Sequence, residues 1–225
     1  MLAASTLQFL KKLDKNNNKA WFDANRKQYE AAILDFANLT GQVIAQFGKK
    51  EPAIALLQPK ECVFRINRDV RFSKNKAPYK NNMGASIKAG GKKSLAAGYY
   101  IHLEPGGKSF VGGGLYMPDA SIVGKIRQEI DYNYAEFLKI VQNKKFVAQY
   151  GGLDFSEGMS LVREPKGYEK ENPAITYIKL KSWVATAPLS DTALQDKNLA
   201  TQLTKAFEYL QPLISFLNEA LEALS

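Results

Sequence analysis

The stretch AGYYIHLEPGGKSFVGGGLY, residues 97–116, decides the fold class of this chain. Residues 97–104 and 108–116 are rich in aromatic and aliphatic side chains, and the tripeptide PGG at 105–107 is typical of a hairpin turn. Because helical patterns precede and follow this hairpin, we predict an α+β fold. In that fold a central, mainly antiparallel sheet is flanked by long N-terminal and C-terminal helices.

The flanking helices are predicted from apolar residues that recur at helical spacing. Ser5 or Thr6 would cap a short helix to about Asp14, and one long helix would follow and end at Phe47. Because the chain contains no linker or internal repeat, we predict a single domain over residues 1–225. The pattern further predicts helices at about 119–131, 134–142 and 198–224, a loop at 163–173 and a strand at 179–187.

The segment CVFRINRDVRF, residues 62–72, alternates apolar and polar side chains and predicts a half-buried strand. The residues expected to share the buried face are Cys62, Phe64, Ile66, Val70 and Phe72, whereas Val63 would lie on the other face. Arg68 is an exception, because it falls on the apolar face unless a bulge intervenes. The polar face would carry, in order, Arg65, Asn67, Asp69 and Arg71.

Composition narrows the class of protein. The single cysteine, Cys62, excludes an internal disulfide and a cysteine-based zinc site, and it makes the cytoplasm the expected compartment. No stretch approaches the roughly 18 apolar residues that a membrane helix needs, so no membrane association is predicted. No cofactor and no metal site are predicted either.

The positive charge of the chain is concentrated in residues 60–93, which we call the basic segment. The chain has a net charge of +9, and this segment holds ten cations against Glu61 and Asp69, a net charge of +8. A local excess of this kind is typical of a surface that faces an anion. We therefore predict binding of a phosphate or carboxylate, with arginines as bidentate donors and lysines as point charges. The predicted ligand-binding residues in this segment are Arg65, Arg68, Asp69, Arg71, Lys76, Tyr79 and Lys80.

Three motifs outside this prediction do not carry a function. GKS at 107–109 lacks the earlier glycine of a phosphate-binding loop, and GGG at 112–114 favours close backbone approach within a strand. Ser73 and Lys76 have the spacing of a serine–lysine nucleophile, but Ala77-Pro78 opposes the helix that this motif requires. His102 shares a strand face with Glu104 and could be a general base, although a solvent-facing strand histidine is the interpretation that the pattern favours.

Two other functions compete with anion binding. The cations could form a structural ion network with Glu164, Glu169 or Glu171, or they could bind nucleic acid together with Phe72 and Tyr79. No known nucleic-acid reader motif is present, which makes the second alternative the weaker one. Whether the protein catalyses a reaction, and its oligomeric state, are left open by the sequence.

RINRDVRFSKNKAPYKNN, residues 65–82, closely resembles the signature of the family catalogued as domain of unknown function 2461. Residues 9–30, 98–119 and 163–173 also resemble that family, so the resemblance covers nearly the whole chain. It implies a single-domain cytoplasmic protein and brings no catalytic residues. The family pattern usually has an aspartate where Asn75 stands and a histidine where Asn172 stands.

The segments that carry this resemblance predict a composite site. Lys166 and Tyr168, in the sequence PKGY, would join the cations of the basic segment, with Trp21 and Asn25 nearby. The expected partner is an anionic small molecule, and nucleic acid is the less favoured one.

Overall fold

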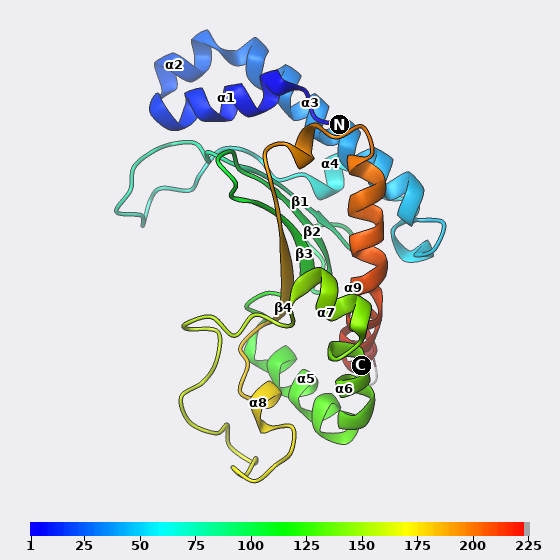
Figure 1. The fold of residues 1–225 in the computed structure, drawn as a ribbon. Helices are drawn as coiled ribbons and strands as arrows, with labels where there is room; N and C mark the ends of the chain where they lie inside the picture. Colours follow the sequence, from blue (N-terminus) through cyan, green and yellow to red (C-terminus); the bar gives the residue numbers. More distant parts are fainter. Residues whose placement is uncertain (223–225) are drawn as a thin grey trace. The chain divides into compact units, whose positions relative to one another are not determined.

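The computed structural model describes residues 1–222, in which nine α-helices and one four-stranded antiparallel sheet confirm the α+β prediction (Figure 1). The strands follow one another in the sheet in the order β1-β2-β3-β4. Their bounds are Met83–Ile87 (β1), Gly98–Leu103 (β2), Ser109–Leu115 (β3) and Trp183–Leu189 (β4). The helices are Ala4–Lys15 (α1), Lys19–Ala24 (α2), Arg26–Phe47 (α3), Pro59–Cys62 (α4), Ala120–Tyr132 (α5), Tyr134–Val141 (α6), Lys144–Tyr150 (α7), Ile175–Ile178 (α8) and Leu199–Glu222 (α9).

The chain divides into two compact units, which we describe separately. Unit 1 comprises Met1–Lys93, Tyr100–Val111 and Pro188–Lys205, and unit 2 comprises the remaining residues. Each unit therefore contains parts of the sheet and of α9. The prediction of one domain over the whole chain stays a prediction.

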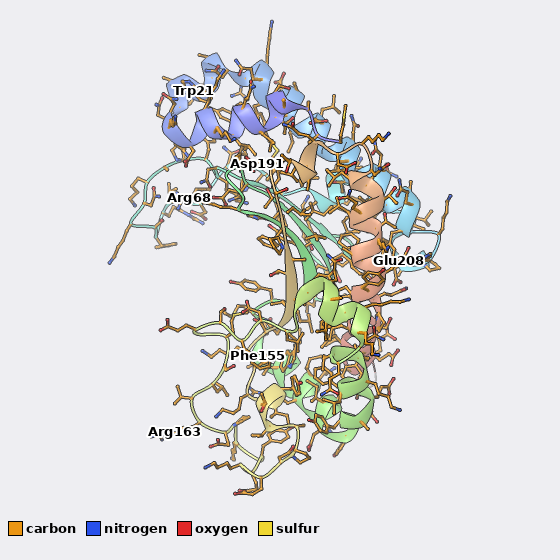
Figure 2. All side chains as sticks on the ribbon, in the orientation of Figure 1. Trp21, Arg68, Phe155, Arg163, Asp191 and Glu208 are labelled. Carbon is orange, nitrogen blue, oxygen red and sulfur yellow. The ribbon has the colours of Figure 1, made fainter. Side chains whose placement is uncertain are left out.

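The hairpin formed by β2 and β3 agrees with its prediction from residues 97–116. Gly106 and Gly107 both adopt positive φ angles in the turn, a conformation that favours glycine. Asp191 holds this turn, because its carboxylate accepts hydrogen bonds from the N–H groups of Gly106 (3.0 Å) and Gly107 (3.1 Å) and from Lys11 Nζ (3.1 Å; labelled in Figure 2). The turn of the sheet is thereby tied to α1 within unit 1.

The first helix is not capped as expected. It begins at Ala4, and neither Ser5 nor Thr6 serves as its cap. Instead Asp35 of α3 accepts hydrogen bonds from the Ala3 N–H (2.9 Å) and the Thr6 hydroxyl (2.6 Å). A carboxylate of α3 therefore fixes the start of α1, whose first N–H groups have no side-chain cap.

The single long helix predicted to end at Phe47 is interrupted. It is divided into α2 and α3 at Asn25, whose side-chain amide donates to the Trp21 carbonyl (2.8 Å). Such a bond competes with the helical backbone pattern, which explains the break. The end at Phe47 is confirmed.

The later elements agree closely with the expected ones. The helices predicted at 119–131 and 134–142 correspond to α5 and α6, and the strand predicted at 179–187 lies slightly later, as β4. The last helix continues through Pro212 to Glu222, and the remaining expected residues, 223 and 224, lie outside the described part of the chain. The sequence did not predict β1, α7 or α8.

The strand predicted over residues 62–72 is wrong. Cys62 ends the short helix α4, and the residues after it make only isolated bridges, Val63 to Ala85 and Asn67 to Tyr79. Phe72, expected on the buried face, is 96% exposed. The alternation of side chains is real, but no neighbouring strand provides the continuous ladder that a strand requires.

Cys62 itself is fully buried, and burial raises the pKa of its thiol to about 11. Since only the thiolate reacts with disulfide reagents, we expect Cys62 to react at pH 8 at least a hundredfold more slowly than a free thiol, whose pKa is about 8.5. The reaction rate is measured with a chromogenic disulfide in buffer and in denaturant. Fast reaction of the folded protein would contradict this prediction.

Within residues 1–222, none of the helices has the length and apolar character needed to cross a membrane. The same part of the chain contains no cluster of three or more side chains suited to hold a metal ion.

Candidate anion-binding site

The cations of the basic segment fall into two groups in unit 1. Arg65 lines a groove beside α3, whereas Arg68, Arg71 and Lys76 belong to an exposed loop, residues 68–78, which we call the basic loop. Figure 1 shows this loop as a cyan segment that projects away from the helices and the sheet of its unit. The predicted convergence of Arg65, Arg71 and Lys76 on one pocket is not visible among the residues that line the groove.

Two cations of the basic loop, Arg68 and Lys76, bind groups of the loop itself. The Arg68 guanidinium donates to the Ala77 carbonyl (3.1 Å) and to the Ser73 hydroxyl (3.3 Å), and Lys76 Nζ donates to the Val70 carbonyl (3.1 Å). Arg68, expected to be misplaced on an apolar strand face, thus closes the base of a loop instead (Figure 2).

Asp69 and Arg71, which the sequence places on one polar face, pair with each other, whereas Arg65 makes no hydrogen bond to Asp69. The two side chains make a bidentate pair, with Nε–Oδ1 at 3.0 Å and Nη2–Oδ2 at 2.7 Å. Hydrogen bonds from Arg71 lower the pKa of Asp69, and the nearby charge of Arg65 acts in the same direction. Because the pair is exposed, it contributes little to stability.

The groove has a volume of about 780 Å³ and an apolar floor. Ile33, Leu34 and Ala37 of α3 form one side, and Val63 and Phe64 form the other. Leu34 is a large apolar residue and is nevertheless 60% exposed. The remaining lining residues are Tyr29, Lys60, Arg65, Lys92 and Lys93.

No carboxylate lines the groove, although four cations do. Lys92 is bound to the carbonyls of Lys60 and Val63, both at 2.7 Å. The side chains of Lys60, Arg65 and Lys93 make no hydrogen bond or ion pair with another residue of the described chain. The groove therefore combines a mainly apolar lining with three cations at its rim that make no ion pair within residues 1–222.

Lys80 lies close to this rim. Its ammonium group is 5.4 Å from the centre of the Phe64 ring, and no carboxylate in residues 1–222 pairs with it. Burial and the charge of Arg65 lower the pKa of Lys80. A bound anion would compensate both the lost solvation of the Lys80 ammonium group and its repulsion from Arg65. A half-buried lysine beside an arginine therefore favours the approach of an anion.

Tyr79, also expected at the site, is part of the core of unit 1. Its ring stacks on Phe22 with centroids 3.9 Å apart, and only 7% of the residue is exposed. The Asn17 side chain binds both backbone groups of Tyr79, at 3.1 Å and 2.9 Å. A role of Tyr79 in ligand contact stays a prediction, and we do not use it below.

A second polar arrangement lies on β2 within unit 1. His102 Nε2 is 3.1 Å from Glu104 Oε2, and Nδ1 faces the Tyr100 hydroxyl at 3.5 Å. The His102 side chain is 15% exposed and stacks on Phe110, so it does not face solvent as the sequence had favoured. When the imidazole is neutral, the Glu104 carboxylate favours the tautomer that carries the proton on Nε2. Nδ1 is then a hydrogen-bond acceptor, and such an arrangement is able to relay a proton.

Tyr100 connects this arrangement to the groove. Its ring lies 6.4 Å from that of Phe64, and its hydroxyl occupies space above Gly84, where a Cβ atom would be only 2.3 Å away. Burial raises the pKa of Tyr100, so the phenol stays protonated at neutral pH.

The remaining predicted residues belong to unit 2 or to α2. Lys166 is exposed, and Tyr168 is half-buried, with a pKa raised by burial and by Asp131. Asn172 donates to Asp131 (2.6 Å), which anchors the predicted loop at 163–173. Because Lys166 and Tyr168 lie in the other unit, the composite site stays a prediction.

Trp21 and Asn25, expected near that site, make contacts with neighbouring helical residues. Trp21 stacks on Phe9 with centroids 6.0 Å apart, and the Asn25 side chain binds the Trp21 carbonyl and Gln28. Glu164, one of the expected carboxylate partners of the arginines, pairs with Lys179 of unit 2 at 3.3 Å.

The profile of a conserved hypothetical protein family, domain of unknown function 2461 (DUF2461), matches residues 5–216. The chain belongs to the DUF2461 family. The resemblance found from the basic segment is thus confirmed. Neither the curated proteins nor the solved structures include a significant match to this DUF2461 chain.

Proposed function

We propose that the protein binds a small amphiphilic anion, a molecule that carries a phosphate or carboxylate on an apolar body. The apolar body would lie along Leu34 and Phe64 in the groove, and the anionic group would contact Arg65. One observation carries the proposal: the groove is lined by four cations and by no carboxylate. An apolar cavity with a few convergent charged groups is the usual form of a ligand site.

The contacts of the basic loop weaken the structural alternative. The Asp69–Arg71 pair is exposed, with side chains 46% and 77% accessible, and Arg68 and Lys76 bind only loop groups. Such contacts shape one loop and hold no helix or sheet together. Arg65, one of the three free cations at the groove, makes no ion pair within residues 1–222 that would give it a structural role.

Calorimetric titration with octyl phosphate, octanoate, octanol and inorganic phosphate tests the proposal. We expect the two amphiphilic anions to bind more tightly than the neutral alcohol or the bare ion, because only they use both parts of the groove. Replacing Arg65 with glutamine is expected to weaken binding about tenfold, the loss of one charge-assisted contact.

Lys49→Gln is the matched control, because Lys49 is an exposed cation of unit 1 outside the groove. It removes the same charge and is expected to leave binding unchanged. Equal binding of octanol and octyl phosphate, or equal losses in R65Q and K49Q, would contradict the proposal.

A further inference from the structure

The basic loop has a shape that its own residues maintain. At its base, the Arg68 N–H donates to the Pro78 carbonyl (2.9 Å), and the Lys80 N–H donates to the Ile66 carbonyl (2.8 Å). The Ala77 N–H donates to the side chain of Asn75 (2.9 Å). Together with the bonds of Arg68 and Lys76 described above, these contacts cross-link the loop before any ligand binds.

This cross-linked loop holds an aromatic side chain in solvent. Phe72 is 96% exposed, the most exposed large apolar residue of the described chain. The Arg71 guanidinium lies 5.8 Å from the centre of its ring, and Arg71 is in turn held by Asp69. The loop therefore presents an aromatic ring and a cation together in a defined arrangement.

Two side-chain cations of the basic segment are free to bind the phosphates of an extended anion. The side-chain ammonium groups of Lys74, two residues from Phe72, and of Lys80, at the base of the loop, make no hydrogen bond or ion pair with other residues of the described chain. The surrounding basic segment has a net charge of +8. An exposed ring in a segment rich in free cations is the combination that binds unpaired bases and their phosphates.

The chemistry of the loop favours this partner over a membrane surface. Phe72 is the only large apolar residue between Arg71 and Pro78, and its neighbours along the chain are Arg71, Ser73 and Lys74. At a membrane surface, only the Phe72 ring would insert into the bilayer, and its polar neighbours would lie at the boundary of the hydrocarbon region. A single strand would use the ring for stacking and the cations for phosphate contacts.

We propose that the basic loop is a binding site for single-stranded nucleic acid, in which a base stacks on Phe72 while phosphates contact Lys74 and Lys80. The phosphate contact at Lys80 would adjoin the groove, whereas Phe72 and Lys74 belong to the basic loop and do not line the groove. Double-stranded nucleic acid would bind less well, because its bases are already stacked on one another.

Fluorescence polarisation with a labelled 20-nucleotide oligo(dT) tests the proposal, beginning at about 50 mM salt and repeated at higher salt. We expect binding that weakens steeply with salt. Phe72→Ala should weaken it about tenfold without changing the salt dependence, since it removes stacking only. Lys74→Gln should weaken binding and reduce the salt dependence, because one phosphate contact is lost.

Two variants serve as matched controls. Leu56→Ala removes another exposed apolar side chain of unit 1, which is 91% accessible, and Lys49→Gln removes another exposed cation. Both should bind as the wild type does. All variants change exposed side chains, and circular dichroism with thermal unfolding verifies that each one folds.

Four results would overturn the proposal. The first is no binding to the single strand at about 50 mM salt, and the second is an equal effect of F72A and L56A. The third is binding to vesicles of neutral and anionic phospholipid that F72A abolishes while oligonucleotides do not bind, which would assign the loop to membrane surfaces. A 20-base-pair duplex bound as tightly as the single strand would also contradict the stacking of a base on Phe72.

Discussion

Replacing Gly114 with alanine is expected to lower the free energy of unfolding by more than about 3 kcal/mol, a large part of the total stability of a typical domain. Gly114 lies in β3 with a φ angle of +124°, where an L residue is strained. A Cβ atom there would be only 1.9 Å from the carbonyl oxygen of Trp183. Because that oxygen belongs to the backbone of β4, relief would require the two strands to separate.

Gly152→Ala is the matched control for this prediction. Gly152 also belongs to unit 2 and has a φ angle of +137°, but no atom lies within 4 Å of the position that its Cβ would occupy. It therefore carries the backbone strain without the clash, and we expect a loss of about 1 kcal/mol. Urea unfolding of both variants separates the two effects. Equal stability of G114A and G152A would show that β3 and β4 do not approach as closely as described.

Truncation of Tyr79 to alanine is expected to lower the free energy of unfolding by about 3–5 kcal/mol, the usual cost of removing a large aromatic ring from a core. The Tyr79 ring stacks on Phe22, which also contacts Tyr29, with ring centres 5.0 Å apart. Loss of the ring would leave a cavity at the base of the basic loop. The measurement is again denaturant unfolding monitored by circular dichroism.

Tyr79→Phe distinguishes the packing role of Tyr79 from the ligand role that the sequence predicts. Within residues 1–222 the hydroxyl makes no hydrogen bond, so Y79F should be within about 1 kcal/mol of the wild type. If Y79F keeps its stability but loses affinity for octyl phosphate, the hydroxyl contacts the ligand after all. If Y79A is as stable as the wild type, the stack on Phe22 does not support the core.

The sequence was most informative where local patterns and local structure coincide. The hairpin of β2 and β3 was predictable because its strands are neighbours along the chain and its turn contains Gly106 and Gly107. Close backbone approach at GGG, 112–114, was predictable from residue type alone, since only glycine tolerates it, although the strand approached at Gly112 and Gly114 is the distant β4. The long helix to Phe47 was largely correct, although the break at Asn25 depends on one side-chain hydrogen bond.

The candidate site was only partly predictable. The sequence located the cations and placed Asp69 and Arg71 on one polar face, two positions apart, but it did not show that Asp69 pairs with Arg71 and not with Arg65. It did not separate Arg65 from the basic loop, because the separation depends on where the chain turns after α4. It also missed Leu34, Lys60 and Lys93, whose relevance appears only when the chain folds beside α3.

By itself the sequence determined the α+β class, the family and the concentration of charge in residues 60–93, because composition and local alternation require no knowledge of distant contacts. Only the tertiary structure decided which cations bind other protein groups and which stay free. The alternating pattern at 62–72 would have made a strand if a partner strand had been available along its length. With isolated bridges instead, the same residues form the rim of a groove and a loop that exposes Phe72.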